Sequence, residues 1–215
     1  MIIVYRTPSE RKNTIGKDIK TVTVDFAVMT TNGVSCLVND PGRIARDVRV
    51  IQERFAQANV KVVTNSVNYF PAPPIIAPTF TNWVIRTNIS SSNGVLTTEA
   101  KAVIKAANPV LQGYSLIYVP FLRAVTNQNP NVTTHGSAVT EYFYNDPADA
   151  SYLGNSFVSV VTDSLTPPHE LGHVLRLRHT SMAWNLMRSQ TSANGMLGTK
   201  RFTTNQIDTI RGKLK

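Results

Sequence analysis

Two histidines, His169 and His173, stand four residues apart around Glu170 in the pattern H-E-x-x-H. On a helix these two positions lie about 40° apart around the axis and one turn apart in height, so both imidazoles can reach one ion. A catalytic zinc uses neutral imidazole nitrogens and keeps one coordination position open for water. Glu170 follows the first histidine and can take a proton from that water. The pattern therefore predicts a zinc site with an adjacent base.

A third histidine, His179, follows six residues after His173, so three of the four histidines lie within eleven residues. In a continuous helix His179 would point about 240° away from His173 and lie about 9 Å further along the axis. It can share the ion only if the helix ends near Arg176 and the chain turns back. Glycine adopts the left-handed conformation of such turns freely, whereas arginine there costs on the order of 1 kcal/mol. We expect Arg176 either to accept that strain or to give the turn another shape.

Segment 169–179 resembles the zinc signature of the metzincin metalloproteases, in which H-E-L-G-H and a third histidine precede a turn that contains a methionine. Met187 falls at the spacing of the matrixin-type members, and residues 201–210 resemble their closing helix. The resemblance implies a zinc-dependent endopeptidase that hydrolyses peptide bonds of a protein or peptide substrate, with Met187 as a structural residue. The site residues that it implies are the zinc ligands His169, His173 and His179 and the general base Glu170.

The resemblance also implies a fold, an α/β (α+β) domain with a twisted mixed β-sheet, a zinc-binding active-site helix, a Met-turn and a C-terminal helix. We expect residues 1–215 to form one catalytic domain, with residues 1–20 as an N-terminal extension. Residues 21–179 would form the sheet and zinc-helix part, and residues 180–215 the Met-turn and C-terminal helix. A strand at 156–162 would be the sheet edge along which an extended substrate lies antiparallel.

Apolar patterns predict the elements that must position these side chains. Residues 21–29 alternate apolar and polar side chains, which is typical of a half-buried strand. Residues 43–58 carry one apolar stripe at helical spacing, and residues 60–68 predict a strand parallel to the first. The stripe consists of Ile44, Val48, Ile51 and Phe55. Further along, we expect a helix at 97–107 and strands at 83–86, 115–119, 139–144 and 156–162.

The overall composition places the chain among globular proteins. It has 215 residues, of which 42% are hydrophobic and 16% charged, enough to bury a sizeable core. No run of 18 apolar residues predicts a membrane span. Cys36 is the single cysteine, which excludes an intrachain disulfide and a multi-cysteine zinc cage, so we expect a free thiol, buried or partly exposed. The opening residues do not form a secretory signal. We therefore expect either export by a signal-independent route, as an effector or toxin, or a cytoplasmic protein.

The formal net charge of +9 keeps a second class of function open, a non-catalytic basic binding domain with a structural or vestigial zinc site. The basic residues are scattered, however, which is typical of a solubility feature. Three of them, Arg43, Arg46 and Arg49, lie off the apolar stripe, so we expect them on a solvated helix face. A purely structural zinc also has no need of Glu170. We therefore expect a monomeric enzyme without a nucleic-acid partner. Salt-sensitive nucleic-acid binding without proteolysis would favour the binding domain.

Overall fold

The main sheet of this protein is mixed and strongly twisted. The computed structural model describes residues 18–76, 84–88, 95–107, 113–125, 132–141, 144, 146–188 and 200–214. Within them the sheet consists of β1 (Lys20–Thr31), β2 (Val34–Ser35), β3 (Val60–Pro71), β5 (Tyr114–Val119), β8 (Gly136–Ala138) and β9 (Asn155–Ser159). The main strands follow the order β3-β1-β5-β9-β8, and β2 forms a hairpin with the end of β1.

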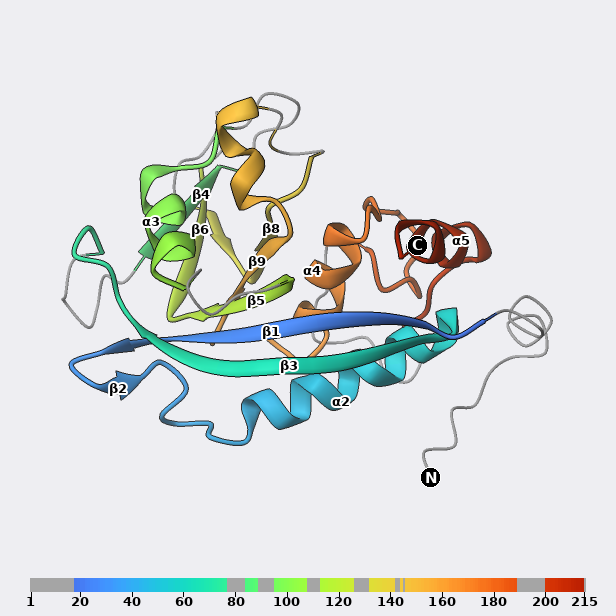
Figure 1. The fold of residues 1–215 in the computed structure, drawn as a ribbon, viewed down its shortest axis with the longest axis horizontal. Helices are drawn as coiled ribbons and strands as arrows, with labels where there is room; N and C mark the ends of the chain where they lie inside the picture. The colour runs from blue at the N-terminus through green and yellow to red at the C-terminus, as the bar shows by residue number, and fades with distance from the viewer. Residues whose placement is uncertain are drawn as a thin grey trace.

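Four of the five main strands are parallel to one another, and β8 is antiparallel to them. β3, β1, β5 and β9 run in one direction, whereas β8 pairs antiparallel with β9 at the sheet edge. Figure 1 shows β1 and β3 side by side, with α2 (Arg43–Phe55) along β3. The parallel pair predicted from residues 21–29 and 60–68 is confirmed, and both strands are longer than predicted.

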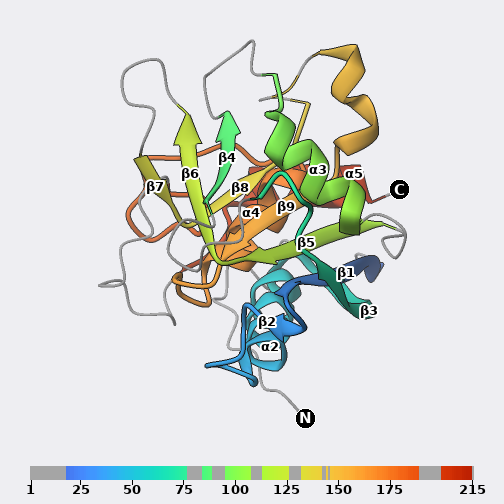
Figure 2. The same cartoon turned by 90° about the vertical axis from the view of Figure 1, so that its left-hand side faces the viewer.

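A smaller sheet lies at the opposite end of the molecule from α2 (Figure 2). It contains β4 (Val84–Asn88), β6 (Phe121–Val125) and β7 (Val132–Thr134), with β4 parallel to β6 and β7 antiparallel to it. Only β4 had a counterpart in the predicted elements, at 83–86. β6 follows β5 after a single residue, and its apolar residues were indistinguishable from the end of that strand.

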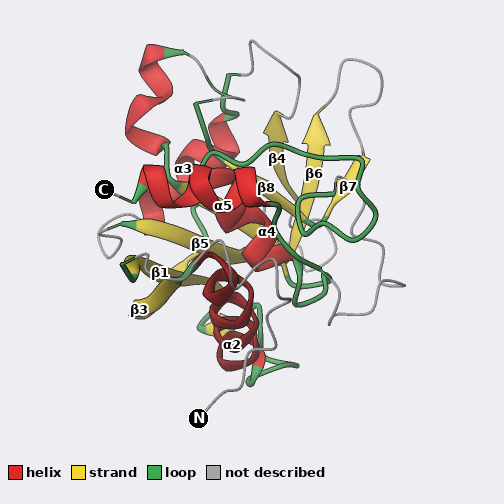
Figure 3. Ribbon diagram, turned by 90° about the vertical axis from the view of Figure 1, so that its right-hand side faces the viewer, coloured by secondary structure: helices red, strands yellow, loops and turns green. Residues whose placement is uncertain are grey.

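Helices cover both faces of the main sheet. They are α2, followed by the short 3₁₀ helix η1 (Ala56–Ala58), α3 (Thr98–Ala107), the 3₁₀ helix η3 (Pro147–Tyr152), α4 (Thr166–Val174) and α5 (Thr204–Lys213). Phe26 on β1 packs in one core cluster with Phe55 of α2 and Leu171 of α4, whereas its neighbour Ala27 packs in a second cluster with Val103 of α3. Alternation along β1 therefore places α2 and α4 on one face and α3 on the other. Figure 3 shows α4 between α5 and α2.

Two predicted strands differ from the structure. The strand predicted at 139–144 is wrong, because β8 ends at Ala138 and the amide of Tyr144 then donates to the carbonyl of Thr140 in a turn. The strand predicted at 156–162 ends at Ser159 and is not an edge, because β9 pairs with both β5 and β8. Val139 and Tyr144 are buried although neither belongs to a strand, whereas Val161, after the end of β9, is 54% exposed. An apolar run alone therefore does not show whether its backbone pairs with another strand. On this side of the sheet the edge strand in the described residues is β8.

The predicted apolar stripe of α2 is confirmed, but the three arginines predicted for its solvated face differ in exposure. Ile51 and Phe55 are fully buried. Arg46 and Arg49 are exposed, as predicted, but Arg43 is only 4% exposed, so its assignment to a solvated face was wrong. No helix in the described part of the chain is long and apolar enough to cross a membrane.

Cys36 is a free thiol at the junction of the two core clusters, and its Sγ donates to the carbonyl of Tyr118 at 3.5 Å. Burial raises the pKa of Cys36 to about 12. Because the thiolate is the reactive form, we expect iodoacetamide at pH 8 to alkylate the folded protein roughly 100-fold or more slowly than the protein unfolded in guanidinium. Equal rates in the two states, measured by mass spectrometry over time, would contradict this burial.

Candidate metal centre

The helix that carries the first two histidines, α4, is buried along its whole length. Pro167 and Pro168 occupy its first turn, where the missing amide hydrogens need no partner within the helix. The carboxylate of Asp163 accepts the amides of Leu165 and Thr166 at 2.9 and 3.2 Å, so it binds donors that the first turn leaves free. The chain therefore enters α4 in one defined geometry.

The end of α4 is a tight reversal. The helix stops at Val174, and Arg176 has a φ of 71° in the left-handed region. The amide of Arg176 donates to the carbonyl of His173, and the amide of Leu177 donates to the carbonyl of Gly172, both at 2.9 Å. This pair of bonds is the Schellman arrangement that closes helices. Arg176 therefore accepts the strain of a position that usually holds glycine, and the chain turns back as the position of His179 required.

The reversal brings the three histidines together. The Nε2 atoms of His169 and His173 lie 3.0 Å apart, those of His173 and His179 also 3.0 Å, and those of His169 and His179 3.3 Å. His169 and His173 are buried, whereas His179 is exposed, so the cluster reaches the surface on the His179 side. The three rings form a group that could hold a metal ion.

The backbone fixes how two of the rings are protonated. Nδ1–H of His169 donates to the carbonyl of Leu186, and Nδ1–H of His173 donates to the carbonyl of Leu177, both at 2.7 Å. Each Nε2 is then an acceptor with its lone pair directed into the cluster. Lone pairs that converge at such distances repel one another unless a cation lies between them.

Burial keeps these imidazoles neutral. It lowers the pKa of His169 to about 4, against the opposing effect of the Leu186 hydrogen bond, and it lowers the pKa of His173 well below the ordinary value. The pKa of His179 is lowered as well, because its ring is partly desolvated where it meets the other two, although the residue as a whole is exposed. Neutral nitrogens are the form that binds zinc, and in a tetrahedral zinc site they lie about 3.3 Å apart. The described donor set therefore fits a zinc ion.

Glu170, the residue after His169 on α4, lies against the backbone of the edge strand. A Cβ added at Gly136 of β8 would come within 2.7 Å of the Glu170 Cδ and closer to its Cγ. The carboxylate therefore occupies the space that a side chain at position 136 would need. Burial raises the pKa of Glu170 to about 8, and a cation bound next to it would favour the ionised form instead.

The turn that contains Met187 packs against α4 next to the histidines. Met187 is fully buried, and a Cβ at Gly172 would lie 2.5 Å from its Sδ, so the methionine packs directly against the helix between the two histidines. Met182 is 45% exposed, which agrees with the prediction of Met187 as the turn methionine. Sequence analysis missed Asn185, whose side chain accepts the amide of Met187 at 2.8 Å and donates to Gln206 of α5 at 2.7 Å. Asn185 therefore connects the turn to the C-terminal helix.

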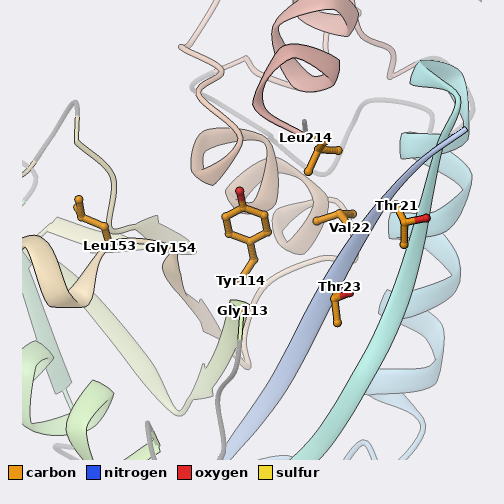
Figure 4. A pocket seen from close by; sticks show the side chains of 8 residues that line it. All are labelled: Thr21, Val22, Thr23, Gly113, Tyr114, Leu153, Gly154 and Leu214. Atoms are coloured by element: carbon orange, nitrogen blue, oxygen red, sulfur yellow. The ribbon is translucent and has the colours of Figure 1, made fainter. Parts of the chain in front are cut away.

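Two pockets lie elsewhere on the molecule. The larger, about 270 Å³, is bordered by Tyr114, Val22 and Leu214 among others (Figure 4). The second, about 140 Å³, shares Tyr114 with it and extends to Arg176. Neither pocket is lined by the three histidines or by Glu170. The chemistry-bearing residues therefore belong to a separate place in the fold.

Comparisons with known proteins agree on the fold. No protein-family model and no curated protein sequence matches this chain. Its structure is similar to archaemetzincin from Methanopyrus kandleri, with a TM-score of 0.56 and 14% identity over 90% of this chain and 96% of that one. It is also similar to metalloproteinase-II from Bacteroides fragilis, with a TM-score of 0.52 and 11% identity over 95% of this chain but 60% of that one. This chain therefore shares its fold with these two proteins.

Replacing Arg176 by glycine tests the strained reversal. Glycine removes the cost of a left-handed residue, and the ion pair with Glu141 that is lost is half-exposed and contributes little. We expect Arg176→Gly to raise the free energy of unfolding by about 0.5–1 kcal/mol, measured by urea denaturation. Arg178→Gly, at an exposed neighbour without a positive φ, should lower it. A destabilised Arg176→Gly variant would show that the ion pair outweighs the strain.

Proposed function

We propose that this protein is a zinc-dependent endopeptidase with a matrixin-like Met-turn. His169, His173 and His179 would hold the zinc, and Glu170 would be the general base. The observation that carries the proposal is the convergence of three imidazoles, two of them oriented by backbone carbonyls, with the buried Glu170 directly after the first of them in the sequence. The names of the two similar structures, an archaemetzincin and a metalloproteinase, support the same class of activity.

The residues divide the chemistry between them. A bound zinc supplies a Lewis acid that polarises the scissile carbonyl and lowers the pKa of water. Glu170 takes the proton from the attacking water and returns it to the leaving amine as the bond between carbonyl carbon and nitrogen breaks. His169 and His173 hold their orientation through the carbonyls of Leu186 and Leu177, so the site needs little rearrangement on substrate binding.

The substrate would lie along β8. This strand is the antiparallel edge of the main sheet, and its Gly136 borders the carboxylate of Glu170. An extended peptide that added to this edge would present a backbone carbonyl next to the general base. We assign the role to β8 and not to residues 156–162, because β9 has a partner on each side.

A single catalytic domain is supported by the two core clusters of the described ranges, because one contains residues from Val22 to Leu214 and the other, from Ala27 to Phe157, packs on the opposite face of the same sheet. One cluster alone joins β1, α2, α4 and α5. The boundaries at residues 20 and 179 remain predictions, as do the monomeric state, the effector role and the export route.

The first test compares the native chain with Glu170→Gln, which keeps the shape of the side chain but cannot act as a base. We expect one zinc in each, measured by elemental analysis, and a fall of roughly 100-fold or more in cleavage of an unfolded protein mixture. His173→Ala should lose the zinc itself. Undiminished cleavage by Glu170→Gln would remove Glu170 from the mechanism, and a native chain without zinc would refute the proposal.

A second test uses the contact between Glu170 and the edge strand. Gly136→Ala introduces a methyl group within 2.7 Å of the Glu170 Cδ, so the carboxylate must move while the histidines stay in place. We expect zinc content to be unchanged and cleavage to fall by about 10-fold or more. Gly42→Ala is the matched control, because a Cβ at Gly42 meets nothing within 4 Å. Equal activity of the two variants would mean that Glu170 acts from another position.

A further inference from the structure

Arg43, on the first turn of α2, is buried and makes its contacts with the chain that leads into the zinc helix. Its Nε donates to the carboxylate of Asp47 at 2.5 Å. One terminal nitrogen donates to the carbonyl of Thr162 at 2.8 Å, and the other donates to the carbonyl of Asp163 at 3.1 Å. A longer contact of 3.4 Å reaches the carbonyl of Val160. The planar guanidinium thus binds the segment 160–163 at several points.

The sheet holds this arginine in place. Asp47 is fully buried, and it also accepts the hydroxyl of Tyr118 at 2.8 Å. Tyr118 lies on β5 in the middle of the main sheet and is itself fully buried. Arg43 is therefore anchored to the sheet through Asp47 and is not free to follow the segment that it binds.

The segment that Arg43 binds also forms the start of α4. Thr162 and Thr166 share a hydrogen bond between their hydroxyls at 2.5 Å, and the side chain of Asp163 accepts the amide of Thr166. Arg43 holds the carbonyls of Thr162 and Asp163, while their side chains hold the first turn of the helix. His169 stands three residues after Thr166 and Glu170 four, which is one turn further along.

The other parts of the centre are held differently. Gly136 belongs to β8, and Leu186, whose carbonyl orients His169, is held by a hydrogen bond from its amide to the carbonyl of Arg201. A shift of α4 along its axis would therefore move His169 and Glu170 relative to groups that do not move with them.

We propose that Arg43 is a positioning residue for the metal centre, which fixes the height of α4 against the sheet through the carbonyls of residues 160–163. The inference rests on the proposed function in that the three histidines hold zinc. It predicts an effect on the affinity and geometry of the metal, beyond any effect on folding stability.

The experiment measures zinc binding and stability separately in Arg43→Met, which keeps the length of the side chain without its donors, and in Arg43→Lys. Arg49→Met is the matched control, because Arg49 lies on the same helix with its side chain exposed to solvent. We expect Arg43→Met to bind zinc about 10-fold more weakly in a chelator competition, with Arg43→Lys in between and the control unchanged. The rise in melting temperature that zinc produces should shrink in the same order, and the visible spectrum of the Co²⁺-loaded protein should change.

A purely structural role gives a different pattern. Arg43→Met would then lower the melting temperatures of the metal-free and zinc-loaded forms equally, with zinc affinity within twofold of the native value and the Co²⁺ spectrum unchanged, and this result overturns the inference. If the native chain binds no zinc, the proposed function and this inference both fail. If the native chain binds zinc and Arg43→Met binds it equally well, only the inference fails. If Arg43→Met does not fold, Tyr118→Phe replaces it by removing a hydrogen bond to Asp47. Unchanged zinc affinity in both Tyr118→Phe and Arg43→Lys also overturns the inference.

Discussion

The reversal of the chain after α4 is the constraint on which the candidate site depends. A helix that continued past Val174 would carry His179 away from the other two rings, and two imidazoles alone would remain. The amide of Leu177 closes the helix, and the carbonyl of the same residue orients His173. Termination of the helix and orientation of a ring are thus two results of one turn. The strain at Arg176 is the local cost of this geometry.

β8 of the main sheet and the turn that contains Met187 pack against α4. β8 lies against Glu170, and the absence of a side chain at Gly136 leaves room for the carboxylate beside the backbone. From the other side Met187 fills the space next to Gly172. α4 is therefore packed between β8 and the turn that contains Met187. At each contact a glycine, Gly136 on β8 or Gly172 on α4, allows an approach that any larger residue would block.

Local signals predicted much of this arrangement. The strand at 21–29, the stripe of α2 and the end of α4 near Arg176 all follow from residues that are neighbours in sequence, and the structure confirms each. The alternation predicted a half-buried strand, however, whereas residues 24–29 of β1 are buried on both faces. The prediction of a strand at 139–144 failed because an apolar run does not show whether its backbone pairs with another strand. The prediction that Arg43 lies on a solvated helix face failed because its partners at residues 160–163 are more than a hundred positions away in the sequence. Only its spacing of four from Asp47 was visible in the sequence, and such pairs are common on exposed helices.

The edge of the sheet opposite β8 has a consequence for the behaviour of the protein in concentrated solution. In the described residues β3 pairs with β1 alone, and after Lys61 this strand has no charged side chain up to its end at Pro71. Val67 and Tyr69 are 43% and 62% exposed on it. Proteins usually protect such edges with charges or bulges, because an open strand is a template for the strand of another molecule. β3 has a bulge at Asn65, opposite the step from Val24 to Asp25 of β1, so its edge is interrupted there. A lysine in place of the exposed Val67 would add a charge to this edge and further oppose self-association in concentrated solution.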